Sequence, residues 1–247
     1  MKRCVTFFLV LTVLLCPLSA EAEEKIMAAV AANFMKPFEE IVRLYEAKTN
    51  INIEPTYTST GRLYAQIIKG APYDVFLAAD EKRPALLHKD GLAENPFVYA
   101  KGQVIIWSAN KELCQVKDWK EMAQNPCVKK IAMANIETAP YGTVSMIALK
   151  DMGLWEKLQP KLVFAQTIAQ VFQYASTESV DAGFCAYSSA FTDEGRKGCF
   201  LEVKEAQGVT QAACVLRRAA DKEMADKFAT FLHSPEADAV KRSYGYK

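Results

Sequence analysis

Short apolar runs alternate with longer amphipathic segments along most of this chain of 247 residues. Residues 26–32 and 104–108, for example, are short and almost wholly apolar, as buried strands are. Residues 34–48 instead place Phe38 and Ile41 at helical spacing. Such an alternation predicts an α/β fold with mainly parallel sheets and flanking helices.

This pattern sets the expected order of the elements. Strands are expected at residues 26–32, 51–58, 74–78, 104–108, 131–134 and 182–186, with later ones around Val203 and at 215–216. Helices are expected at residues 34–48, 62–69, from 84 onward, 143–152, 167–176, 221–232 and 235–243. Residues 102–107 and 209–217 are candidate crossings between two lobes, although they could equally be ordinary strands of one sheet.

The first 22 residues have the organisation of an export signal. Two basic residues precede an apolar run at residues 5–15, and Ala20-Glu21-Ala22 fits the small-x-small pattern of a cleavage site. We therefore expect residues 1–22 to be cleaved off as a signal peptide, because the run is too short to remain as a membrane-spanning helix. The alternative is a lipoprotein signal acylated at Cys16, but Leu15 occupies a position that is normally small.

The charge excludes nucleic acid as a partner. The formal net charge is +1, and loss of residues 1–22 removes two basic residues and one acidic residue, which leaves a neutral chain. Nucleic-acid binding requires a strong basic excess or a basic stripe. A neutral protein that binds an anion must rely on local dipoles and neutral donors instead.

Sequence motifs give little support to an enzyme. No Gly-x-Ser-x-Gly elbow, Walker loop or Rossmann glycine pattern occurs, and neither histidine lies near a Ser or Cys with the setting of a nucleophile. Asp74 and Asp80 could pair as carboxylates, but they more naturally cap the two ends of the strand between them. Tyr141, Tyr187 and Tyr244 could ligate ferric ion, but no adjacent pair of tyrosines supports such a site.

Five cysteines remain after loss of the signal: Cys114, Cys127, Cys185, Cys199 and Cys214. Disulfides persist in exported proteins, and an odd number of cysteines leaves at least one free thiol. We consider a Cys114–Cys127 bridge, which would close a short helical stretch, and a Cys199–Cys214 bridge between two strand-like segments. Cys185 lies within an apolar run and is expected to be a buried core thiol. No Cys-x-x-Cys pattern suggests a metal site.

Three junctions share one design, in which a buried strand is followed by small or polar residues and then by a helix. They are residues 30–34, 58–63 and 135–143. The first N–H groups of a helix have no partner within it, and the aligned peptide dipoles make that end partly positive. A helix start is therefore a ready anion site. The side chains that add donors there are Asn33, Ser59, Thr60 and Thr143.

The alternative for each junction is ordinary capping, in which the polar side chain satisfies the N–H groups of its own helix. Several junctions in one α/β chain favour a ligand site, because ligands of open α/β folds bind at the carboxyl ends of the strands. A fourth junction is possible at residues 166–168, where Thr167 would cap the helix.

Five segments carry a resemblance to a known family: Ala31-Ala32-Asn33-Phe34, residues 58–67 (Thr-Ser-Thr-Gly-Arg-Leu-Tyr-Ala-Gln-Ile), residues 70–80 (Gly-Ala-Pro-Tyr-Asp-Val-Phe-Leu-Ala-Ala-Asp), residues 139–142 (Ala-Pro-Tyr-Gly) and residues 182–184 (Ala-Gly-Phe). On these segments the chain resembles the periplasmic molybdate-binding proteins of ABC importers, which are type II periplasmic substrate-binding proteins. The resemblance covers essentially the whole mature chain.

The resemblance implies a fold of two lobes that close on an anion, with two crossover strands as the hinge. We expect the first lobe to comprise residues 23–103 and 214–247, and the second lobe to comprise residues 104–213.

The resemblance also implies a ligand site built from neutral hydrogen-bond donors. Side-chain contacts fall on Asn33, which donates through its amide in place of a serine, and on Thr60 with Ser59 beside it. Backbone contacts fall on Tyr141 and Ile168. The contacting tyrosine of the family falls on Ala186, which cannot replace a phenol, and Tyr187 could do so only with a local shift in register.

The function implied is that of the substrate-binding component of an ABC importer, a monomer in the periplasm that captures molybdate or tungstate. Its partner would be the importer's permease in the inner membrane, and it would be no enzyme and need no cofactor. Two alternatives stay open: a binding protein for another oxyanion such as sulfate, and an α/β enzyme acting on a small anionic substrate. A site of donors alone favours a fully deprotonated anion, and Glu137 is the one carboxylate close to a junction in sequence.

Overall fold

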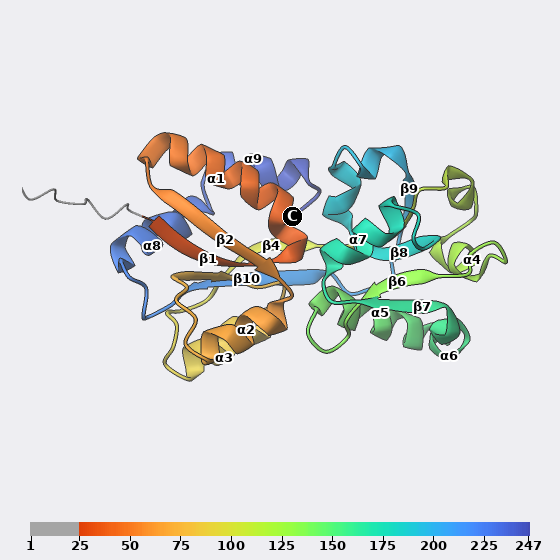
Figure 1. Cartoon of the computed structure of the whole chain (residues 1–247), viewed down its shortest axis with the longest axis horizontal. Coiled ribbons are helices and arrows are strands. Elements are labelled where there is room, and N and C mark those ends of the chain that lie inside the picture. The colour runs from red at the N-terminus through yellow and green to blue at the C-terminus, as the bar shows by residue number, and fades with distance from the viewer. Residues whose placement is uncertain (1–24) are drawn as a thin grey trace, which may run out of the picture.

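The computed structural model describes residues 25–247, which form two α/β lobes joined by two crossings of the chain (Figure 1). The expected signal peptide at residues 1–22 and the alternative acylation site Cys16 lie outside the described residues. Each lobe has a five-stranded sheet covered by helices. The two-lobed α/β architecture expected from the sequence is therefore confirmed.

The first lobe is built on a sheet with strand order β2-β1-β3-β10-β4. The strands are β1 (Lys25–Ala31), β2 (Asn52–Thr58), β3 (Val75–Leu77), β4 (Phe97–Gly102) and β10 (Val209–Val215). The helices are α1 (Met35–Thr49), α2 (Thr60–Ile68), α3 (Lys82–Lys89), α8 (Lys222–Phe231) and α9 (Pro235–Ser243), preceded by the short 3-10 turn η1 (Ala32–Phe34).

Alternating residues of β1 serve the two faces of that sheet, as the two-residue repeat of a strand requires. Ala28 and Val30 belong to a core shared with α1, α8 and α9, in which Phe38 and Phe228 meet edge to face. Ala29 belongs to a second core, shared with α2 and α3. Figure 1 shows the two groups of helices on opposite sides of the sheet.

The second lobe has the strand order β7-β6-β8-β5-β9. The strands are β5 (Val104–Ser108), β6 (Ile131–Ala134), β7 (Leu162–Ala165), β8 (Ala182–Ala186) and β9 (Cys199–Glu202). The α-helices are α4 (Trp119–Gln124), α5 (Pro140–Asp151), α6 (Trp155–Leu158) and α7 (Ile168–Ser176), and the 3-10 turns are η2 (Lys111–Cys114), η3 (Gln159–Lys161), η4 (Tyr187–Phe191) and η5 (Gly195–Lys197).

Both sheets are mixed rather than mainly parallel. In the first, β1 pairs in parallel with β2 and β3, whereas β10 is antiparallel to β3 and β4. In the second, β6 pairs in parallel with β7 and β8, whereas β5 is antiparallel to β8 and β9. The antiparallel strands are those next to the crossings, where the chain passes directly from one sheet to the other.

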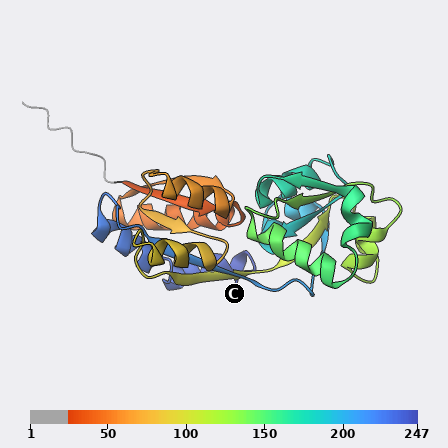
Figure 2. The same ribbon diagram turned by 90° about the horizontal axis from the view of Figure 1, so that it is seen from below.

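The chain crosses between the lobes twice (Figure 2). It leaves the first sheet at Gly102, the end of β4, and enters the second at Val104, the start of β5. It returns between the end of β9 and the start of β10 at Val209. All of β10 pairs within the first sheet, so residues 209–213, which we expected in the second lobe, lie in the first.

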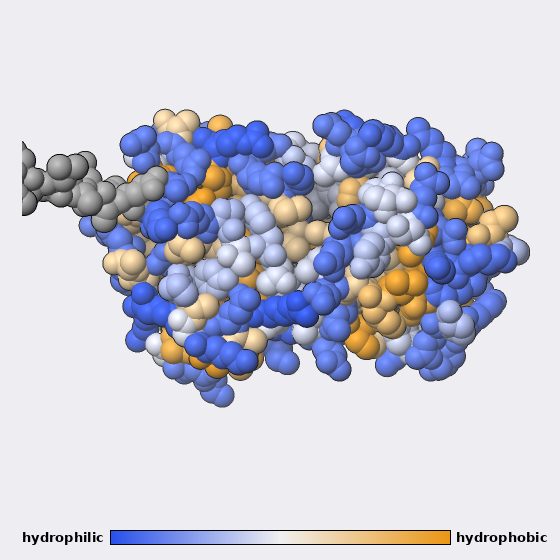
Figure 3. Space-filling model, viewed as in Figure 1, coloured by the Kyte–Doolittle hydropathy of each residue, from blue (hydrophilic) through white to orange (hydrophobic). Residues whose placement is uncertain are grey.

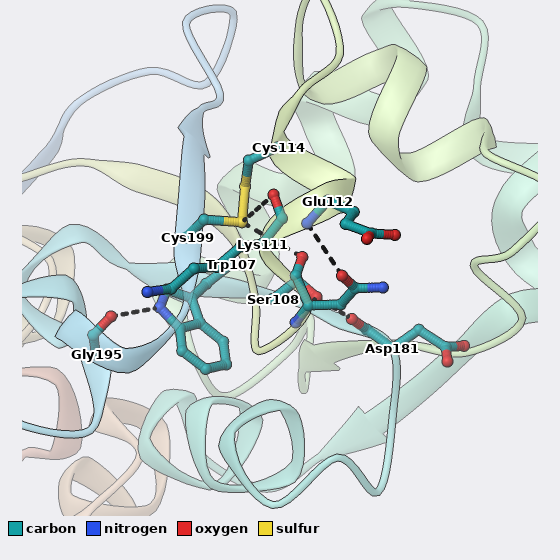
Figure 4. Close-up of a disulfide and its surroundings, with 9 residues drawn as sticks. Trp107, Ser108, Lys111, Glu112, Cys114, Asp181, Gly195 and Cys199 are labelled. Carbon is teal, nitrogen blue, oxygen red and sulfur yellow. Dashed lines mark hydrogen bonds between the residues drawn. A yellow bond between two sulfur atoms is a disulfide. The ribbon is translucent and has the colours of Figure 1, made fainter.

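One disulfide joins Cys114 of η2 to Cys199 of β9, with a Cα–Cα distance of 6.1 Å (Figure 4). Both expected bridges are therefore wrong. Cys214 lies buried in β10 of the other lobe, and Cys127 is exposed with a free thiol. The pairing of β9 with β5 is what brings Cys199 beside η2. Cys185 is a buried free thiol, as expected.

The exposed face in Figure 3 is mostly hydrophilic, with apolar residues in small patches. Large apolar side chains with more than a third of their surface exposed are scattered over many elements, from Leu44 in α1 to Phe200 in β9. Scattered apolar residues of this kind are ordinary on protein surfaces. None of the described helices is long and apolar enough to cross a membrane.

Candidate anion-binding site

Helix starts from both lobes surround one small cavity. Its walls are Ala31, Ala32, Asn33, Ser59, Thr60 and Ala79 from the first lobe and Ala139, Pro140, Tyr141 and Ile168 from the second. The cavity measures about 10 Å³. Sites for drug-sized organic ligands span roughly 300–1,000 Å³. The space therefore suits a ligand of only a few atoms.

The structure brings together five of the six residues expected at the site: Asn33, Ser59, Thr60, Tyr141 and Ile168. The sixth, Ala186, ends β8 and does not line the cavity. The ring of Tyr187 packs against Phe191 and Phe200, with centroid distances of 4.9 and 5.4 Å. The position of the family's contacting tyrosine therefore supplies no phenol to the cavity.

The Ser59 hydroxyl is buried and has no hydrogen-bond partner among the described residues. Ser59 stands at the N-cap of α2 and is 4% exposed, yet its side chain makes no capping bond. The capping alternative therefore fails at this residue. A buried hydroxyl without a partner costs about 1–3 kcal/mol, so a ligand oxygen in the cavity would relieve an unmet hydrogen bond.

The neighbouring Thr60 hydroxyl has one partner and a free proton. Its Oγ1 accepts a hydrogen bond from the Ala79 N–H at 3.0 Å. A hydroxyl has one donor proton besides its acceptor lone pairs, and this one is donated to no other described residue. Thr60 is 1% exposed and lines the cavity. The Ala79 N–H thus fixes the hydroxyl oxygen and leaves its proton for a ligand.

Backbone donors come from the first turns of α5 and α7. The N–H groups of Tyr141 and Ile168 donate to no carbonyl among the described residues. Thr167 caps α7 through its hydroxyl, which accepts from the Gln170 N–H at 3.1 Å, so the capping alternative holds for that side chain. The N–H groups of Tyr141 and Ile168 therefore remain free to donate to an anion at these helix starts.

Two other expected side-chain donors are engaged within the protein. Asn33 Nδ2 donates to Gln211 Oε1 at 2.7 Å and to the Tyr246 hydroxyl at 3.0 Å, which uses both amide protons. The Thr143 hydroxyl donates to the Ile136 carbonyl at 2.7 Å. The expectation that Asn33 donates to the ligand through its amide therefore does not hold in this arrangement.

No charged side chain lines the cavity. Charged groups instead connect the lobes beside it. Arg62 Nη1 donates to Gln166 Oε1 at 2.6 Å, and Arg83 Nη2 donates to the Glu137 carbonyl at 2.9 Å. The Glu137 side chain does not line the cavity, so no carboxylate is present to accept a proton from a ligand. The site offers neutral donors, as the resemblance implied.

The lobes are closed against each other at this site. The Gly61 N–H, in the first turn of α2, donates to the Thr138 carbonyl of the second lobe at 2.8 Å. A Cβ added to Gly61 would stand 2.9 Å from the Thr138 Cα, which is closer than real Cβ atoms come. Glycine is thus required for the two backbones to approach this closely.

The carboxylates and the tyrosine considered above for an enzyme or a ferric site make hydrogen bonds and ion pairs within the protein. Asp74 accepts hydrogen bonds from the Met27 N–H at 2.6 Å and the Ala220 N–H at 2.8 Å, while Asp80 forms an ion pair with Arg83. Neither carboxylate lines the cavity. Burial raises the pKa of Tyr141 well above its usual value, and that phenol accepts a hydrogen bond from Gln211. Tyr187 and Tyr244 do not line the cavity, so the three tyrosines considered as ferric ligands do not meet there.

A fold of two hinged lobes around a small cavity is the fold of a solute-binding protein, and a family model supports that class directly. The model described as bacterial extracellular solute-binding protein matches residues 26–247. The chain belongs to this family.

Similar proteins narrow the comparison further. The chain is 34% identical over 227 residues to the molybdate-binding protein ModA of Rhodobacter capsulatus, covering 91% of this chain and 89% of that protein. It is also 34% identical over 233 residues to ModA of Azotobacter vinelandii, covering 92% and 91%. The solved periplasmic molybdate-binding protein of Azotobacter vinelandii matches the structure with a TM-score of 0.84 at 29% identity, over 90% of this chain and 98% of that one. The resemblance stated from the sequence is confirmed.

Proposed function

We propose that this chain is the extracytoplasmic substrate-binding component of an ABC importer and that it captures molybdate or tungstate between its two lobes. Ser59 carries the proposal most directly, because its buried hydroxyl lacks a partner and lines the cavity. The Thr60 hydroxyl and the N–H groups of Tyr141 and Ile168 complete a set of donors drawn from both lobes. Similarity to two proteins named for molybdate supports the choice of anion.

The composition of the site favours a fully deprotonated anion. The cavity is lined by hydroxyl and backbone donors and by no carboxylate, whereas an oxyanion that retains a proton also needs an acceptor. Molybdate, tungstate and sulfate all satisfy this requirement, and their size separates them. Sulfate therefore stays the leading alternative within the same class of function.

The proposal includes the partner and the location of the protein. We expect a permease in the inner membrane to receive the anion from the closed form, and we expect the exported protein to act in the periplasm as a monomer without a resident cofactor. Binding without chemistry is the proposed role. Turnover of small anionic esters by the purified protein would favour the enzyme alternative instead.

Calorimetric titration of the mature protein with molybdate, tungstate, sulfate and phosphate tests the proposal. We expect tight binding of molybdate and tungstate at one site per chain, much weaker binding of sulfate, and no heat with phosphate. Preferential binding of sulfate would move the assignment to the alternative. Absence of binding and of thermal stabilisation with all four anions would overturn the proposal. The variant Thr230→Ala, which lacks an exposed hydroxyl of α8 far from the cavity lining, should bind as the wild type does.

A further inference from the structure

A buried polar cluster lies directly behind the cavity. We define this cluster as Asn33, Tyr99, Tyr141, Ser188, Gln211 and Tyr246, each no more than 7% exposed. Gln211 joins its members, because Oε1 accepts from Asn33 and from the Tyr99 hydroxyl at 3.0 Å, while Nε2 donates to the Tyr141 hydroxyl at 3.3 Å. Such a network is costly to bury unless its members are paired, and here Gln211 provides partners for three of them.

The cluster is shared between the lobes. Tyr141 and Ser188 belong to the second lobe, and the other members belong to the first. The Tyr246 hydroxyl lies 2.9 Å from the Asn33 carbonyl and 3.1 Å from Ser188 Oγ. Ser188 Oγ is in turn 3.1 Å from the same carbonyl. In the closed arrangement, these contacts of Ser188 join the second lobe to the first.

The cluster is continuous with the anion site. Asn33 lines the cavity, and its side-chain nitrogen is held on Gln211 and Tyr246 rather than left for a ligand. The Asn33 carbonyl accepts hydrogen bonds from the hydroxyls of Tyr246 and Ser188. The conformation of η1, which forms one wall of the cavity, is therefore set by groups that do not line it.

The last residues of the chain hold Tyr246 in place. Lys247 exchanges two backbone hydrogen bonds with Lys101 of β4, at 2.8 and 3.1 Å, immediately before the first crossing. Gly245 has a φ of 75° and packs so closely on the second lobe that a Cβ would stand 2.6 Å from the Phe191 ring. The C-terminal segment Gly245–Lys247 thus lies between the hinge and the second lobe.

We propose that Tyr246 is a positioning residue for anion capture: its hydroxyl holds η1 in shape and, through Ser188, stabilises the closed arrangement of the lobes. The proposal rests on the proposed function and identifies a determinant of affinity outside the cavity. Contacts made only in the closed state slow opening, and so they lower the rate of ligand release more than they raise the rate of capture.

The first test compares Tyr246→Phe with Tyr244→Phe in the full mature chain. Tyr244 is the matched control, because its hydroxyl donates to Glu40 within the first lobe. We expect Tyr246→Phe to weaken molybdate binding roughly fivefold to thirtyfold, the effect of one or two lost hydrogen bonds, mainly through faster dissociation. Tyr244→Phe should bind as the wild type does. Equal affinity of Tyr246→Phe and wild type, or a loss confined to the association rate, would overturn the proposal.

Ser188→Ala provides a second variant, should Tyr246→Phe fail to fold. It removes the contact between Ser188 and Tyr246 from the other lobe, so we expect it to weaken molybdate binding by itself. Where Tyr246→Phe does fold, the double variant should lose less affinity than the sum of the two single effects. Full additivity would contradict a shared contact.

A measurement of lobe closure in the anion-free protein tests the role of Tyr246 independently of the proposed function. Cys127 is an exposed free thiol of the second lobe, and Lys89→Cys supplies a second labelling site on the first. Spin-label distances in the anion-free protein should show a smaller closed population for Tyr246→Phe than for the parent. An unchanged population would overturn the closing role, whether or not molybdate binds.

Discussion

At the scale of single residues, the candidate site contains hydroxyl and N–H groups whose protons are accepted by no described residue. Ser59 has no partner, and Thr60 is held by the Ala79 N–H with its own proton free. Polar groups buried without partners are uncommon in folded proteins. The unpartnered Ser59 hydroxyl beside the cavity distinguishes this junction from an ordinary helix cap.

Ser59→Ala separates ligand binding from stability. The substitution removes a buried hydroxyl with no partner, so the melting temperature of the anion-free protein should stay the same or rise. Molybdate affinity should fall by about 0.5–3 kcal/mol, the range for a lost hydrogen bond. Calorimetry and a thermal melt of the same sample measure both. Unchanged affinity would show that Ser59 does not face the anion.

The sequence predicted most of the cavity at this scale but not the groups behind it. Asn33, Ser59, Thr60 and Tyr141 follow strands or open helices, and local pattern locates such positions. Gln211 and Thr210 are polar residues of an otherwise apolar strand, and a glutamine in such a strand is a local signal of a buried polar network. Its contact with Asn33 spans 178 residues of sequence, and no local pattern encodes a contact of that range.

At the scale of elements, strand ends and helix starts position the donors, and their close approach depends on a glycine. α2 begins at Thr60, directly after β2, and its first turn meets the loop that precedes α5. Each lobe thus contributes the positive end of a helix to the same space. Closure requires that the backbones of the two lobes touch at Gly61.

Gly61→Ala should therefore weaken binding without destabilising the separate lobes. Alanine is favoured over glycine inside a helix by roughly 1 kcal/mol. The melting temperature of the anion-free protein should therefore fall by no more than the lost contact between the lobes contributes. The added Cβ would stand 2.9 Å from the Thr138 Cα and oppose closing. We expect at least a tenfold loss of molybdate affinity by calorimetry. Wild-type affinity would mean that closure at Gly61 is not needed.

The disulfide belongs to the same scale, because it ties η2 to β9 at the far edge of the second sheet. Removal by the pair Cys114→Ser and Cys199→Ser should destabilise the protein by about 2–4 kcal/mol, with little change in anion affinity below the melting transition. Alkylation of the protein after denaturation without reductant, followed by peptide mapping, should find Cys127, Cys185 and Cys214 modified. A recovered Cys114–Cys127 peptide would contradict this pairing.

The positions of helices and strands were easier to predict than which strands pair with one another. The periodicity predicted α1, α7 and the apolar strands to within a few residues. It missed β4 and β7, which are both partly exposed and so lack a continuous buried run. The Cys199–Cys214 bridge considered from the sequence would have joined β9 to β10, although the two strands belong to different sheets. Sheet partners are set by packing between distant segments, and a local pattern carries no information about them.

At the scale of the whole molecule, the two crossings between the lobes, the cavity and Lys247 lie in one region. Two crossings join the lobes, the cavity lies between them, and Lys247 is bonded to β4 beside the first crossing. A small bend at the hinge would therefore change the distances between the donors of the first lobe and those of the second together. This arrangement makes affinity a property of lobe closure as well as of individual contacts.

The anomalous diffraction of tungsten in crystals of the mature protein grown with tungstate tests the central claim most directly. The account predicts one strong peak per chain, in the cavity between α2 and α5, with anion oxygens at hydrogen-bond distance, about 2.7–3.0 Å, from Ser59 Oγ and Thr60 Oγ1 and from the N–H groups of Tyr141 and Ile168. A tungsten peak elsewhere in the molecule, with this cavity filled only by water, would contradict it.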